Sequence, residues 1–157
     1  MSHDSFRAGI AVVTALLALG ACATPRSHFP LTRYVPTNRT MLPLGEMHLS
    51  ATQLRLGALE GEMKLQYVGL MPESGGTDMA GGSVYRVKNF DRYFKQNEGR
   101  NGWCSDPPRW VVVSSETGAP AWSKEIFVGL LTVKEWSQFR PEVPGFCGGG
   151  AYVRAPG

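Results

Sequence analysis

The side chains that most often carry chemistry are sparse in this chain of 157 residues. Only two of its histidines, His28 and His48, lie beyond the first 21 residues. A Ser-His-acid triad would have to use His48, and the sequence places no nucleophile beside it. The short motifs of phosphate-binding loops, zinc proteases and serine hydrolases are absent from the sequence. The sequence therefore predicts no catalytic residue, no metal site and no cofactor.

Methionines raise a different possibility, because soft thioether sulfurs together with an imidazole select Cu(I). Five of them lie in the first half of the chain near His48: Met41, Met47, Met63, Met71 and Met79. They form no Met-x-Met or Met-x-x-Met cluster. We therefore favour core packing, in particular for Met47 and Met63, over the alternative of a periplasmic copper-handling protein.

The N-terminal segment has the pattern of an export signal. Arg7 precedes the apolar run from Ala8 to Leu19, and small residues follow that run. The run is shorter than the roughly 20 residues that a spanning helix needs. The pattern therefore predicts a signal peptide over residues 1–21.

The sequence Leu19-Gly20-Ala21-Cys22 at the end of this segment resembles the lipobox of bacterial lipoproteins. The resemblance implies that the Cys22 thiol receives a diacylglyceryl group and that acyl chains attach the mature protein to a membrane. Ala23 stands where lipoproteins retained in the inner membrane usually carry Asp. By the same resemblance we expect the outer membrane, with the protein facing the periplasm.

Cys104 and Cys147 remain once Cys22 is assigned to the lipid. An even pair of cysteines in an oxidising compartment is typical of a disulfide. The alternative is a redox or metal site, but neither cysteine lies in a Cys-x-x-Cys motif. We favour the disulfide.

The charge pattern does not favour nucleic acid as a partner. The net charge is only +3, and it does not change when residues 1–21 are removed, because Asp4 and Arg7 leave together. The basic residues are scattered along the chain rather than clustered. A nucleic-acid-binding domain needs a stronger basic footprint.

The remaining residues predict a mainly β domain, an antiparallel barrel or sandwich with one or two short helices. Four prolines between Ala23 and Leu44 favour an extended tether over residues 22–45, which leaves a compact domain at 46–157. In that domain the apolar–polar alternation of residues 47–51 resumes at Leu54-Arg55-Leu56 shifted by one residue, as a bulge or a tight corner would produce. Strands are expected at 47–51, 54–56, 62–68, 84–87, 109–114, 125–131 and 151–153, and short helical segments at 90–97 and 133–139.

One loop between these strands has a composition suited to recognition. From Pro72 to Ser83 the chain carries Thr, Asp and Ser with two glycine pairs, which indicates a loose and exposed backbone. The candidate recognition residues are Gly75, Gly76, Asp78, Gly81 and Gly82. Together with the predicted lipid anchor and the absence of a catalytic motif, this loop favours a non-catalytic binding module. Such a module would contact an envelope protein, a lipid or the cell wall. The alternative is a lysozyme or protease inhibitor that inserts this loop into an enzyme.

The last third of the chain resembles a group of small secreted or lipid-anchored proteobacterial proteins. The shared features are Gly102-Trp103-Cys104, the run Arg109–Val112, the strand Ile126–Leu131, and Cys147-Gly148 leading to Tyr152. These are framework features, and the resemblance implies no catalytic residues.

Overall fold

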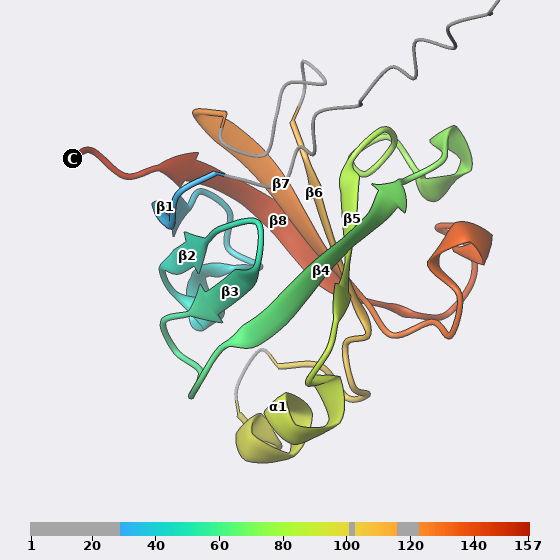
Figure 1. The fold of residues 1–157 in the computed structure, drawn as a ribbon, viewed down its shortest axis with the longest axis horizontal. Helices are drawn as coiled ribbons and strands as arrows, with labels where there is room; N and C mark the ends of the chain where they lie inside the picture. Colours follow the sequence, from blue (N-terminus) through green and yellow to red (C-terminus); the bar gives the residue numbers. More distant parts are fainter. Residues whose placement is uncertain (1–28, 101–102, 116–122) are drawn as a thin grey trace, which may run out of the picture.

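The computed structural model describes residues 29–100, 103–115 and 123–157. Eight antiparallel strands follow one another around a closed barrel, and the first strand pairs with the last (Figure 1). Of the two predicted architectures, the barrel is confirmed. The strands are β1 (Thr32–Pro36), β2 (Met47–Leu49), β3 (Gln53–Leu56), β4 (Met63–Leu70), β5 (Ser83–Val87), β6 (Trp110–Ser114), β7 (Glu125–Leu131) and β8 (Phe146–Arg154). One helix, α1 (Phe90–Asn97), and three 3-10 turns, η1 (Leu42–Leu44), η2 (Glu73–Gly75) and η3 (Trp136–Gln138), complete the described chain.

The domain begins earlier than the sequence predicts. Strand β1 closes the barrel against β8 with Tyr34 opposite Arg154, and the Tyr34 side chain is fully buried. Pro36 ends β1, beyond Tyr34, the last residue of β1 that pairs with β2. Phe29 is also buried, so the prediction of a tether is wrong for residues 29–45. Cys22 and the predicted signal peptide lie outside the described residues.

The barrel interior is filled by side chains. In β2 and β3, Met47, Leu49, Leu54 and Leu56 point inward and are buried, as the alternating pattern predicts. The predicted corner is confirmed: β2 ends at Leu49, which pairs with Leu54 across the turn. The same inner cluster receives the large side chains of Tyr34, Met63, Tyr85, Val111, Val113, Ile126, Val128, Leu130 and Tyr152.

A second apolar cluster lies outside the barrel wall. Strand β6 is buried on both faces, with Val111 facing the interior cluster and Val112 the outer one. The segments before β5 and after β7 cover the outer face through Met71, Met79 and Phe139. Figure 1 shows these two segments, which contain η2 and η3, on the same side of the barrel. The prediction of a central strand that is apolar on both faces is therefore confirmed.

Helix α1 lies across one end of the barrel (Figure 1). Tyr93 points from the helix into the interior cluster, where its ring meets Trp103 edge to face at 5.5 Å. Phe90 and Phe94 pack against the same cluster at helical spacing. The predicted helix over 90–97 has these same limits.

Cys104 and Cys147 are joined by a disulfide, with their Cα atoms 5.3 Å apart. The bond links the segment that enters β6 to the start of β8, and the predicted pairing is confirmed. Within the described residues, no helix is both long enough and apolar enough to span a membrane.

Candidate functional site

Two adjoining hollows lie on the outer side of the barrel, and we call them together the loop cleft. The polar hollow has a volume of about 450 Å³ and the aromatic hollow about 210 Å³. Thr77, Asp78 and Phe127 line both hollows, so the two are neighbours. The polar hollow is also lined by Asn38, Ser114, Ser115 and Glu125, and the aromatic hollow by Phe139, Pro141 and Phe146.

Two glycines lie against aromatic rings that line the aromatic hollow. Gly129 of β7 pairs with Gly149 of β8, so two neighbouring positions of the sheet carry no side chain. A Cβ atom on Gly149 would lie 2.8 Å from the Phe146 ring and 2.9 Å from the Phe127 ring. The glycines therefore let both aromatic rings lie against the backbone, and Phe146 remains 44% exposed there. Strand β8 begins at Phe146, well before the predicted 151–153, and Gly149 is the position of its glycine triplet that the two rings require.

The predicted recognition loop forms one wall of the loop cleft. Met71 and Met79 anchor it to the outer cluster, and Met71 exchanges hydrogen bonds with the main chain of Gly81 and Gly82. Gly75 is buried because Met71 fills the space where its Cβ would lie. The expectation of a loose, exposed backbone is therefore wrong for the packed part of this loop.

The five candidate residues differ in what they can contact. Gly75 and Gly82 are buried, Gly76 is half-buried, and Asp78 and Gly81 are exposed. Gly75, Gly76 and Asp78 line the cleft. Of these, only Asp78 presents a functional side chain to a ligand.

The polar hollow carries negative charge at two points. The side chains of Asp78 and Glu125 both line it and are exposed, and in the described parts of the chain neither carboxylate forms an ion pair. The Ser114 hydroxyl donates a hydrogen bond to the Asp78 carbonyl, which fixes the loop backbone over β6. The arrangement therefore presents two carboxylates beside an aromatic surface.

The sequence did not identify most of the cleft. Glu125 and Phe127 alternate with the inward-facing Ile126 and Val128, and this alternation was the signal that they lie outside. The pairing of Gly129 with Gly149 depends on the register between β7 and β8. Because local sequence patterns do not set this register, the pairing could not be predicted from the sequence.

The other candidates for chemistry do not converge. His48 is half-exposed and follows the fully buried Met47, so the two side chains lie on opposite faces of β2. Met63 lies in the inner cluster, whereas Met71 and Met79 belong to the outer cluster. Across residues 29–100, 103–115 and 123–157, no three His, Cys, Asp or Glu side chains are grouped as metal ligands.

No protein-family model matches the chain, and no curated protein or solved structure matches it either. The fold and the site define a class: a small antiparallel eight-stranded barrel with a helix across one end and a cleft on its outer wall.

Proposed function

We propose that this protein is a lipid-anchored binding module of the bacterial envelope and that the loop cleft holds a segment of a partner protein. The partner segment carries an apolar side chain next to a lysine or arginine. One observation carries the proposal: two exposed carboxylates without ion pairs among the described residues adjoin a hollow lined by Phe127, Phe139 and Phe146.

The two ends of the cleft contribute different parts of the affinity. Burial of one large apolar side chain against the aromatic hollow provides about 1.5–3 kcal/mol. Each exposed ion pair with Asp78 or Glu125 adds at most about 1 kcal/mol, because water screens it. The carboxylates therefore act mainly by selecting and steering basic partners.

The proposed anchor would hold the cleft close to the membrane. The packed domain starts at Phe29, seven positions after Cys22. At roughly 3.6 Å per extended residue, a seven-residue connection reaches about 25 Å at most. In this proposal Cys22 is lipidated, the protein lies in the outer membrane facing the periplasm, and its partners are envelope proteins within this short reach.

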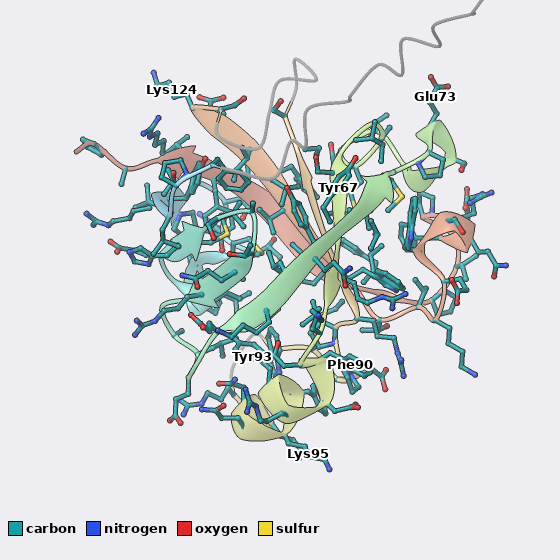
Figure 2. All side chains as sticks on the ribbon, in the orientation of Figure 1. Tyr67, Glu73, Phe90, Tyr93, Lys95 and Lys124 are labelled. Atoms are coloured by element: carbon teal, nitrogen blue, oxygen red, sulfur yellow. A yellow bond between two sulfur atoms is a disulfide. The ribbon has the colours of Figure 1, made fainter. Side chains whose placement is uncertain are left out.

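Peptide titration tests the cleft. We expect a short peptide with adjacent phenylalanine and lysine to shift the NMR signals of residues around Phe127 and Phe146, and peptides with Phe-Glu or Ala-Lys in place of Phe-Lys to bind at least about fivefold more weakly. D78N and F146A should each weaken binding several-fold. Glu73 is the matched control, because it lies on the same loop but points away from the barrel at the tip (Figure 2). Equal losses in E73Q and D78N would contradict the proposal.

A second candidate, an enzyme inhibitor, is favoured by the form of the loop. Glu73 and Ser74 are exposed at its tip, while Met71 and Gly75 on either side are buried. Such a pre-ordered tip could enter an enzyme cleft with little loss of entropy. Assays of lysozyme and protease activity test this function. E73Q should lose the inhibition and F146A should keep it, which is the reverse of what we expect for peptide binding.

A further inference from the structure

A third hollow, separate from the loop cleft, collects positive charge; we call it the basic hollow. It has a volume of about 250 Å³ and is lined by Arg86, Phe90, Arg109, Trp110 and Lys134. It shares no lining residue with the loop cleft. The three cationic residues come from β5, from the position before β6 and from the segment after β7.

Both arginines lie beside Trp110, the first residue of β6. Arg86 is the cross-strand partner of Trp110, and its guanidinium carbon lies 5.2 Å from the centre of the indole ring. The main chain of Arg109 is bonded on both sides, accepting from the Val87 N–H and donating to the Leu131 carbonyl. Its guanidinium carbon lies 4.5 Å from the centre of the Phe90 ring.

The Trp110 ring is itself fixed. Its indole N–H donates a 2.8 Å hydrogen bond to the carbonyl of Val133, the residue before Lys134. One aromatic side chain therefore positions Arg86 through its face and the Lys134 segment through its edge.

None of the three cations has an acidic partner in the described chain. The ion pairs there use Arg33, Lys64 and Arg100 instead. Three positive charges around one small volume repel one another unless an anion lies between them. Each guanidinium group contacts one ring, and its five N–H donors leave several available for an anion.

We propose that the basic hollow binds a phosphate group. Arg86 and Arg109 match two phosphate oxygens through their N–H edges, and Lys134 adds a point charge. A phosphomonoester carries roughly −1.5 to −2 charges near pH 7 and offers three acceptor oxygens. It therefore balances three cations better than a carboxylate with a single charge. The phosphate belongs to a lipid headgroup or to a soluble or polymer-linked phosphomonoester.

Two probes separate these sources. The first is inorganic phosphate, followed by the arginine side-chain and backbone NMR signals of the full chain carrying Cys22→Ser, which excludes the proposed lipidation. The second is flotation with phosphatidylcholine vesicles that contain phosphatidic acid. R86Q, R109Q and K134Q each remove one charge from the hollow. K124Q is the matched control, because Lys124 lies at the opposite end of the barrel from α1 and Phe90 (Figure 2).

We expect saturable phosphate binding at Arg86 and Arg109, with affinity reduced at least about tenfold in R86Q and R109Q and several-fold in K134Q. K124Q should stay within about twofold of the parent protein. If the same variants weaken vesicle binding in the same order, the phosphate belongs to a lipid headgroup. If phosphate binds and vesicles do not, the phosphate comes from a soluble or polymer-linked source.

Thermal unfolding of each variant verifies its fold, and K134Q, at an exposed position, tests the site if R109Q is unstable. Non-saturable binding, or equal losses in K124Q and R86Q, would overturn the proposal.

Discussion

The side-chain amide of Asn97 pairs with both main-chain groups of Glu60. Its oxygen accepts a hydrogen bond from the Glu60 N–H at 2.8 Å, and its nitrogen donates to the Glu60 carbonyl at 3.0 Å. Asn89 at the other end of α1 does the same with the Lys64 N–H and the Glu62 carbonyl. Two asparagine side chains thus attach the helix to the chain that leads into β4.

Asn97 should therefore be important for stability. It is fully buried, and its amide nitrogen also donates to the Tyr93 carbonyl. N97A removes all three of these side-chain hydrogen bonds and leaves a cavity at a buried position, and we expect it to lower the free energy of unfolding by about 1–3 kcal/mol in urea denaturation. K95A, on the exposed face of the same helix, should change it by less than about 0.5 kcal/mol. Similar effects of the two variants would show that the Asn97 pairing is not what holds the helix.

Reduction of the disulfide between Cys104 and Cys147 should destabilise the barrel. The bond closes a loop with a sequence separation of 43 residues. In the chain-entropy model, a loop of this size contributes about 4 kcal/mol. Urea denaturation with and without a reductant measures the difference, and a double Cys→Ala variant should match the reduced protein. A reduced protein as stable as the oxidised one would contradict this prediction.

The close packing of two aromatic rings on Gly149 predicts a contrast between adjacent positions of β8. G149A would place its methyl group 2.8 Å from the Val128 carbonyl as well as against two aromatic rings, and a backbone atom cannot move aside easily. We expect a loss of about 1–3 kcal/mol in unfolding free energy and weaker peptide binding. G148A is the control, since a Cβ atom there has no neighbour within 4 Å. If both variants unfold alike, the close packing at Gly149 is not required.

Alkaline pH should weaken the fold through the interior tyrosines. Burial raises the pKa of Tyr93 and of Tyr152 well above the ordinary value near 10. Above about pH 10 the unfolded chain loses these protons first, so the free energy of unfolding falls as pH rises from there towards the folded pKa. Unfolding measured from about pH 9 to about pH 12 should show this fall, and Y152F should reduce it. A constant free energy over this range would contradict the prediction.

Local patterns in the sequence predicted most of the strands. The alternation in β4, the apolar run in β6 and the helical spacing of Phe90, Tyr93 and Phe94 each report a local geometry, and the structure places an element at each. The strand at residues 32–36 was not predicted, because the surrounding prolines suggested an extended tether. The strand forms because it pairs with β2 on one side and with β8, at the other end of the chain, on the other side.

What the sequence determined by itself is therefore the mainly β character, the helix over 90–97 and the pairing of the two cysteines. These depend on side-chain periodicity and on residue type. Only the tertiary structure decided that the sheet closes and which side chains share a surface. Closure sets the register between strands, and register places Gly129 beside Gly149 and Arg86 beside Trp110. Residues scattered along the chain thereby line one cleft and one basic hollow, because contacts across a barrel depend on strand pairing rather than on distance in sequence.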